Sequence, residues 1–201
     1  MYQYRQLTPD QRAQLVQERR ARGYPPHSPP HPLRDQVSYL LTIACYEHRC
    51  HMQSLERRQA LLDALFEAFI RRGIEVRAWV LLPNHYHILA ETPCFDDIGR
   101  ALRFVHGNVA RAWNLQDGAA GRQVWYRFTD RAIRSEGHYY TTLNYIHYNP
   151  VKHGWSVSPY DWAHSSVSWY LEHEGREWLR DLWVSYPVRE YGRGWDDFVE
   201  H

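Results

Sequence analysis

Apolar and polar positions recur along the chain with two different periods. Apolar residues at helical spacing from Leu55 to Phe69, closed by Gly73, are typical of an amphipathic helix. Other stretches are β-branched and apolar, or alternate residue by residue, as strands do. The full pattern predicts, in chain order, a strand over 37–47, a helix over 54–73, strands over 74–82 and 85–92, a helix from Asp96 or Asp97 to about Asn114, a strand over 122–128, and a helix from Ser135 that stops before Pro150.

The order of these elements is β-α-β-β-α-β, followed by one more helix. This order predicts an α+β fold of the ferredoxin-like type, an antiparallel sheet with helices on one face. The turn at Pro83-Asn84 joins the second and third strands into a hairpin. The added C-terminal helix is the element that the ferredoxin-like order does not explain.

The two ends of the chain differ from its middle. Thr8-Pro9-Asp10-Gln11 predicts a capping box, and with it a short helix to about Arg22 that leads into a proline-rich stretch. Residues 1–32 hold five arginines against two acidic residues, whereas residues 171–201 hold four arginines against eight. We therefore divide the chain into a basic arm with a linker (1–32), a folded body (33–170) and an acidic, tryptophan-containing tail (171–201).

Composition narrows the class of protein. With 201 residues and a hydrophobic content of 44%, the chain has enough apolar material for one sizeable globular domain. We expect no transmembrane helix, since no stretch approaches the ~18 apolar residues that one needs. The N-terminus lacks the apolar segment of a secretory signal. Three cysteines without a disulfide framework fit a reducing cytoplasm.

The stretch "LLPNHYHILAET" carries two histidines one residue apart inside an apolar run. Side chains in a strand alternate between faces, so His85 and His87 point the same way and Tyr86 points the other way, toward a core. The pair is either an incidental polar face or a pair of ligands.

The last predicted helix contains a second informative stretch, "GHYYTTLNYIHYNPVKHGW". At 100° per residue, Leu143 and Ile146 share the arc that packs on the body. Tyr145 and Asn149 are four residues apart, so they project together on a flank beside that arc. Tyr148 falls on the other side of the helix.

These stretches, in this order, resemble the REP-associated tyrosine transposases of the single-tyrosine HUH transposase superfamily. "PNHYH" and "YIHYNPVKHG" carry the resemblance, and "DWAHSS" after the helix is similar to a further family signature. The resemblance covers residues 33–170. It implies a bacterial, nucleoid-associated enzyme whose partner is single-stranded or hairpin DNA of repetitive extragenic palindromes, acting as a monomer or homodimer.

The resemblance also implies a site. Tyr145 would be the nucleophile that forms a 5′-phosphotyrosine link and releases a 3′-hydroxyl, since a tyrosine hydroxyl can hold a phosphate covalently. His85, His87 and Asn149 would hold Mg²⁺ or Mn²⁺, which offsets the weak nucleophilicity of a phenol whose ordinary pKa is ~10. Related enzymes often have glutamine in place of Asn149, and the shorter side chain reaches less far.

Basic residues are candidates for binding the DNA backbone. The arginines of the arm either contact phosphates or keep a helix in solution, and a lysine follows the tyrosine motif. The candidate DNA-binding residues are Arg12, Arg19, Arg20, Arg22 and Lys152.

Three further groups have a structural interpretation beside a functional one. Cys45 to His51 mixes cysteines and histidines, but their crowding favours reduced cysteines and surface histidines over a zinc site. His106 is expected on a helix face rather than on DNA. Six of the nine tryptophans follow residue 150, and we expect them to anchor the tail rather than to stack on bases.

Two other functions compete with a covalent transposase. A relative that binds DNA hairpins without cutting them would not need an intact set of His85, His87, Tyr145 and Asn149. A metal-dependent hydrolase that uses water would form no covalent adduct and would not need Tyr145.

Overall fold

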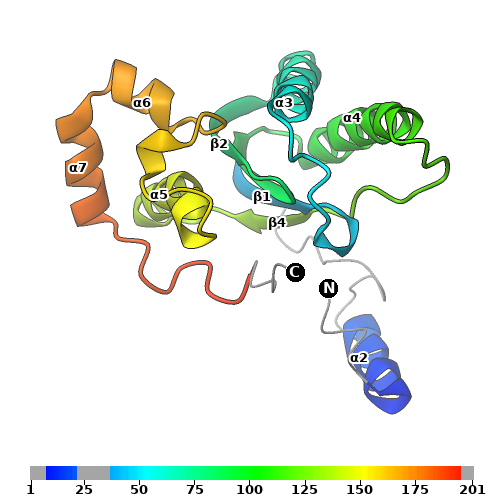
Figure 1. The fold of residues 1–201 in the computed structure, drawn as a ribbon. Coiled ribbons are helices and arrows are strands. Elements are labelled where there is room, and N and C mark those ends of the chain that lie inside the picture. Colours follow the sequence, from blue (N-terminus) through cyan, green and yellow to red (C-terminus); the bar gives the residue numbers. More distant parts are fainter. Residues whose placement is uncertain (1–7, 22–36, 196–201) are drawn as a thin grey trace.

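The computed structural model describes residues 8–21 and 37–195, and Figure 1 shows the arrangement of its elements. The proline-rich stretch after the first helix, Arg22 included, lies outside the described residues. The first helix, α2, runs over Pro9–Ala21 as predicted. Its capping box is formed, because Gln11 N donates to Thr8 Oγ1 (3.3 Å) and Thr8 N donates to Gln11 Oε1 (2.9 Å).

The body is built on a four-stranded sheet with the strand order β2-β3-β1-β4. Every neighbouring pair of strands is antiparallel, which confirms the predicted α+β class and ferredoxin-like order. The strands are β1 (Ser38–Ala44), β2 (Glu75–Leu81), β3 (His85–Glu91) and β4 (Thr129–Ala132).

Helices cover both faces of this sheet (Figure 1). The helices α3 (Leu55–Ile70) and α4 (Phe95–Gln116) pack on one face, against side chains such as Leu41 and Tyr86. The helix α5 (Glu136–Lys152) packs on the other face, against side chains such as Leu40 and Leu89. The short helices α6 (Val167–His173) and α7 (Arg176–Ser185) complete this second layer, and the 3₁₀ turns η1 (Tyr46–His48) and η2 (Pro159–Asp161) lie in connections. The predicted placement of helices on one face therefore holds for α3 and α4, whereas the added helix, together with α6 and α7, covers the opposite face.

The predicted fourth strand over 122–128 is wrong, because β4 begins at Thr129. The earlier stretch forms an isolated bridge between Trp125 and Cys45, just past the end of β1, in which Tyr126 N donates to Ala44 O (3.0 Å). Its apolar pattern arises because Trp125 is buried against α4, where it stacks on His106 at 4.6 Å between ring centroids. The buried ring of Trp125 therefore gave an irregular stretch the apolar pattern of a strand.

Two predicted helix ends are also wrong. α5 continues past Pro150 to Lys152. Proline has no N–H, so Ile146 O lacks the helical hydrogen bond that it would accept from position 150. The helix resumes its bonding afterwards, since His153 N donates to Asn149 O (3.1 Å). α4 starts at Phe95 with Cys94 as its N-cap, so neither predicted aspartate caps it. The two carboxylates lie instead in the first turn, where the positive end of the helix dipole stabilises them.

The motif "DWAHSS" fastens this second layer to the edge of the sheet. Ser166 N donates to Trp79 O (2.9 Å), and Trp79 N donates to Ser166 Oγ (3.0 Å). The same hydroxyl contacts Nε2 of the fully buried His147 of α5 at 2.9 Å. The motif thus ties β2 to the helix that carries the tyrosine.

The tail is packed onto the body. The expected boundary at residue 170 falls inside α6, and Leu179 and Leu182 of α7 are buried in the same cluster as α5. Trp155, Trp162, Trp178, Trp183 and Trp195 pack against that cluster as anchors. Trp169 is 51% exposed. No helix in the described part of the chain is long and apolar enough to span a bilayer.

Candidate active site

The two histidines of β3 lie buried side by side on the α5 face of the sheet. His85 and His87 are almost fully buried, and their ring centroids are 5.2 Å apart. Tyr86 points to the opposite face, where its hydroxyl contacts Nε2 of His106 at 2.6 Å. The prediction from strand alternation is confirmed.

Each histidine has its Nδ1 atom held by a neighbouring oxygen. His85 Nδ1 lies 2.7 Å from Asn84 Oδ1, and His87 Nδ1 lies 2.9 Å from Oγ1 of Thr42, its register partner on β1. A histidine that binds a metal through Nε2 typically donates Nδ1–H to such an oxygen, which fixes the tautomer and the ring orientation. In this arrangement Nε2 is the atom through which each imidazole could bind a metal.

Asn149 reaches the histidines from α5. Its Oδ1 atom lies 3.1 Å from His85 Nε2, and its side chain is fully buried. In the tautomer that donates Nδ1–H to Asn84, His85 Nε2 and Asn149 Oδ1 both present lone pairs, which a shared cation would stabilise; in the other tautomer Nε2–H donates to Asn149 Oδ1. Two adjacent ligand atoms around an octahedral Mg²⁺ ion at about 2.1 Å would lie about 3.0 Å apart. The shorter asparagine therefore meets His85 at a distance suited to a common divalent ion.

Tyr145 lies one helical turn before Asn149 on the same flank of α5. Its ring is fully buried and contacts His87, with 5.2 Å between centroids and 67° between planes. Tyr148 is 40% exposed and contacts Trp183 instead. The helical spacing thus placed Tyr145 and Asn149 correctly, and it turned Tyr148 away.

The C-terminal segment covers the tyrosine. The rings of Tyr191 and Trp195 each lie 5.6 Å from the ring of Tyr145. Tyr191 is anchored in turn, since its hydroxyl contacts Thr142 Oγ1 (2.5 Å) and His138 Nε2 (2.9 Å). Sequence reasoning missed this cover, because nothing local in the sequence relates residues 191–195 to α5.

Gly192 makes that cover possible. Its φ is +81°, and a Cβ atom added there would lie 2.8 Å from Cδ2 and Cζ of Tyr145, and closer still to Cε2. Only a glycine lets the backbone approach the ring this closely.

Lys152 and His153 complete the surroundings of the site. Lys152 Nζ lies 5.3 Å from the ring centroid of Tyr145 and donates to Gly192 O (3.0 Å). The ring of His153 contacts that of His85, with centroids 4.7 Å apart. His153 was missed as a site residue, although it stands inside the motif "NPVKHG".

Known proteins resemble this chain in sequence and in structure, although no protein-family model matches it. The REP-associated tyrosine transposase of Escherichia coli K12 is 34% identical over 110 residues, which cover 54% of this chain and 63% of that protein. A Haemophilus influenzae protein, provisionally described as a transposase of the same kind, is 33% identical over 103 residues, covering 46% and 58% of the two chains. Over about half of its length, the chain is similar to the REP-associated tyrosine transposases.

A solved structure supports the same relationship. The structure of a REP-associated tyrosine transposase bound to a REP hairpin matches with a TM-score of 0.58 and 26% identity, over 71% of this chain and 83% of that one. The sequence matches span less than two thirds of the length of the two curated relatives.

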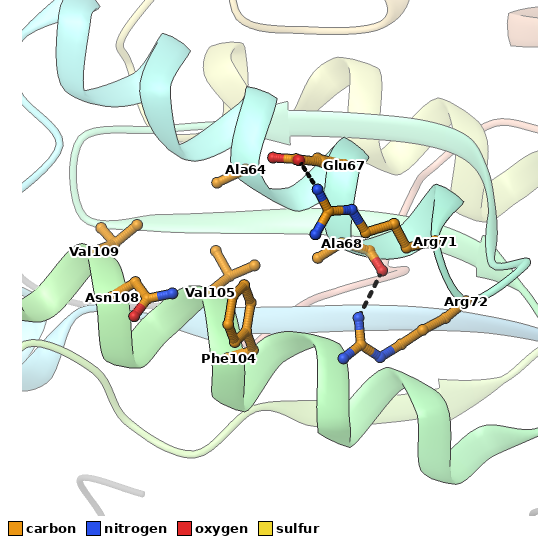
Figure 2. A pocket seen from close by; sticks show the side chains of 9 residues that line it. All are labelled: Ala64, Glu67, Ala68, Arg71, Arg72, Phe104, Val105, Asn108 and Val109. Atoms are coloured by element: carbon orange, nitrogen blue, oxygen red, sulfur yellow. Dashed lines mark hydrogen bonds and ion pairs between the residues drawn. The ribbon is translucent and has the colours of Figure 1, made fainter.

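The cavity between α3 and α4 is not part of this site. It has a volume of about 700 Å³ and lies on the other face of the sheet, and Figure 2 shows Phe104, Arg71 and Arg72 among the side chains that line it. Arg71 pairs with Glu67, and Arg72 donates to Ala68 O. Nothing in it approaches the histidine pair.

The other candidates are placed as follows. Burial raises the pKa of the Cys45 thiol, Cys50 is exposed, and the described residues contain no cluster of three histidine, cysteine or acidic side chains arranged for a metal. His106 lies on a helix face as expected, and burial lowers its pKa to about 3. The predicted DNA-binding arginines of the arm lie on α2 (Arg12, Arg19, Arg20) or outside the described residues (Arg22).

Proposed function

We propose that this protein is a transposase of the single-tyrosine HUH type, which cuts and rejoins single-stranded DNA beside hairpin-forming repeats. One observation carries the proposal: Tyr145 and Asn149 of α5 meet His85 and His87 of β3 in a single buried cluster. A tyrosine, two imidazoles and an amide oxygen supply a nucleophile and an incomplete set of metal ligands. The hydrolase and the non-cleaving binder have no use for the tyrosine in this position.

His85, His87 and Asn149 would hold the divalent ion, Mg²⁺ or Mn²⁺. When bound, such an ion polarises the scissile phosphate and neutralises the charge that develops on it. Asn84 and Thr42 keep the imidazoles oriented for this role through their contacts to Nδ1.

The tyrosine performs the covalent step. Tyr145 Oη attacks the scissile phosphorus, the bond from phosphorus to the 3′ oxygen breaks, and a 5′-phosphotyrosine ester and a free 3′-hydroxyl result. The energy of the bond is kept in the ester, so a 3′-hydroxyl of another strand can reverse the step. Lys152 beside the ring places a positive charge where phenolate and phosphate charge develop.

The reaction requires that Tyr145 first become accessible to DNA. Because the Tyr145 ring is fully buried beneath Tyr191, Gly192 and Trp195, a phosphate reaches its hydroxyl only after that segment is displaced. Displacement also frees Lys152 from Gly192 O. The segment therefore controls access to the nucleophile.

The relatives suggest the substrate. A structural neighbour at 26% identity is described as bound to a REP hairpin, which favours a repetitive extragenic palindrome as the DNA of this chain. By its similarity to these transposases, the enzyme would act in the bacterial cytoplasm, at the nucleoid, as a monomer or homodimer.

A covalent adduct is the decisive test. Purified protein is incubated with Mn²⁺ or Mg²⁺ and a labelled hairpin oligonucleotide with unpaired flanks, and the products are separated on a denaturing gel. Wild-type protein and Tyr148→Phe should give a protein-DNA band, whereas Tyr145→Phe should give none while still retarding the hairpin on a native gel. Cut DNA without an adduct would favour the hydrolase, and retarded but intact DNA the non-cleaving binder.

A further inference from the structure

Three aromatic side chains gather at the end of the sheet nearest the histidine pair. The ring of Tyr126 lies 5.0 Å from the ring of Tyr46 and 5.6 Å from the ring of His48. The planes are tilted by 47° and 43°, so these rings do not stack face to face on one another. All three side chains are half-buried. We call this group the aromatic trio.

The backbone places the aromatic trio beside His85. Ala44, at the end of β1, is the register partner of His85 and accepts a hydrogen bond from Tyr126 N (3.0 Å). Two strand spacings therefore separate Tyr126 from His85, about 10 Å. Cys45 N in turn donates to Asn84 O (2.8 Å), so the turn that holds Tyr46 begins against the residue that orients His85.

The side chains of the trio point to the face that carries the site. Cys45 and Trp125 lie in the cluster under α3 and α4. Cys45 has an extended backbone, so Tyr46 after it points to the opposite face, which is the face of His85 and His87. Tyr126 lies opposite Ala44, whose register partner is His85, and its ring meets the ring of Tyr46. The trio and the histidine pair thus share one surface of the sheet.

The turn that carries His48 has an uncommon backbone. Glu47 and His48 have φ values of +55° and +52°, in the left-handed region that residues other than glycine rarely occupy. Two consecutive residues of this kind cost stability, and such conformations cluster where a site needs a defined geometry. Here they bring His48 to the ring of Tyr126.

Positive charge accompanies the trio along the same edge of the sheet. The stretch 122–134, which leads through Tyr126 into the edge strand β4, contains four arginines and one aspartate. Arg127 is exposed directly beside Tyr126. Arg122 is paired with Asp117, and Arg131 lies over the ring of Trp195, so Arg127 is the cation that accompanies the trio most directly. Aromatic faces next to positive charge are the combination that binds single-stranded nucleic acid, because bases stack on rings while phosphates contact the charge.

We propose that the aromatic trio is a base-stacking site for the unpaired nucleotides next to the scissile phosphate. This inference rests on the proposed function, since it assigns a position to the DNA strand that Tyr145 cuts. The ligand is an unpaired nucleobase, whatever its identity, held by stacking on Tyr126 and Tyr46. His48 closes one side of the group.

Binding of DNA with and without an unpaired flank tests this site. The probes are a hairpin oligonucleotide with a single-stranded flank that carries 2-aminopurine at successive positions, and the same hairpin without a flank. Titrations in EDTA keep the DNA intact, so the result does not depend on cleavage. Stacking should quench 2-aminopurine at one or two flank positions.

Loss of the ring should weaken only the flanked probe. Stacking contributes enough per base that Tyr126→Ala should lower its affinity by about 5- to 150-fold, leaving the hairpin without a flank within about twofold. Tyr126→Phe keeps the ring and should bind like wild type. Trp169→Ala, which removes an exposed aromatic on α6, should change neither affinity.

Two results would overturn the assignment: equal losses for both probes, which would indicate a structural role for Tyr126, or no loss for either. If Tyr126→Ala lowers the melting temperature of the protein, Tyr46→Ala tests the same stacking site with the same two probes. The adduct assay keeps the two proposals apart. An adduct without flank-specific binding refutes the trio alone, whereas flank-specific quenching without an adduct supports the trio and refutes the covalent mechanism.

Discussion

Substitution of Gly192 by alanine should expose the tyrosine. The added methyl would lie 2.8 Å from two carbons of the Tyr145 ring, whereas non-bonded carbons rest at about 3.5–4.0 Å. Ring and segment must therefore separate by roughly 1 Å or more. The ring cannot withdraw easily, since its other side contacts His87. Residues 191–195 must therefore move away from the ring.

The energy of this change follows from two terms. Alanine at a φ of +81° costs about 1–2 kcal/mol, and overpacking typically costs about 1–3 kcal/mol more. Both penalties apply only while the segment lies on the ring, and each 1.4 kcal/mol is a factor of about ten. The fraction of molecules with Tyr145 uncovered should therefore rise by at least about tenfold, until uncovering is complete.

The initial rate of adduct formation with a labelled hairpin measures this effect. Gly192→Ala should form the adduct faster than wild type. Gly175→Ala is the matched control, since its φ is +88° but nothing lies within 4 Å of an added Cβ atom. An unchanged or slower rate for a folded Gly192→Ala variant, with Gly175→Ala like wild type, would refute the idea that the segment limits access to Tyr145.

Three other outcomes are expected. His85→Ala and His87→Ala should abolish adduct formation while retaining most hairpin affinity in a native gel, because affinity comes mainly from backbone contacts elsewhere; normal cleavage by the double variant would refute the ligand assignment. Deleting residues 1–32 should flatten the dependence of the logarithm of hairpin affinity on the logarithm of salt concentration. An unchanged slope would indicate that the arm serves solubility and does not contact phosphates. Burial lowers the pKa of His147 to about 3, so between pH 7 and pH 5 this side chain takes up a proton in the unfolded chain but not in the folded protein. Lowering the pH from 7 to 5 should therefore reduce the His147 contribution to the free energy of unfolding, measured by denaturant titration, by about 2 kcal/mol. His147→Gln should lack that contribution, and an equal pH slope in both proteins would contradict the assignment.

The sequence by itself determined those features that depend on local periodicity. Alternation in a strand put His85 and His87 on one face with Tyr86 on the other, and helical spacing put Tyr145 and Asn149 on one flank. The capping box of α2 was also readable, because its bonds join residues three positions apart. These relations hold wherever the element forms, so no knowledge of the rest of the fold is needed.

Tertiary structure decided everything that depends on the path of the chain. The stretch 122–128 looks like a strand because Trp125 is buried, but it forms only an isolated bridge, and the continuous ladder with β1 begins at Thr129. α5 runs past Pro150 because its packed neighbours outweigh the loss of one backbone bond. The cover of Tyr145 by Gly192 joins residues 47 positions apart and depends on where α6 and α7 return the chain to the sheet. Local patterns cannot encode such contacts, because they arise only when separate elements pack against each other.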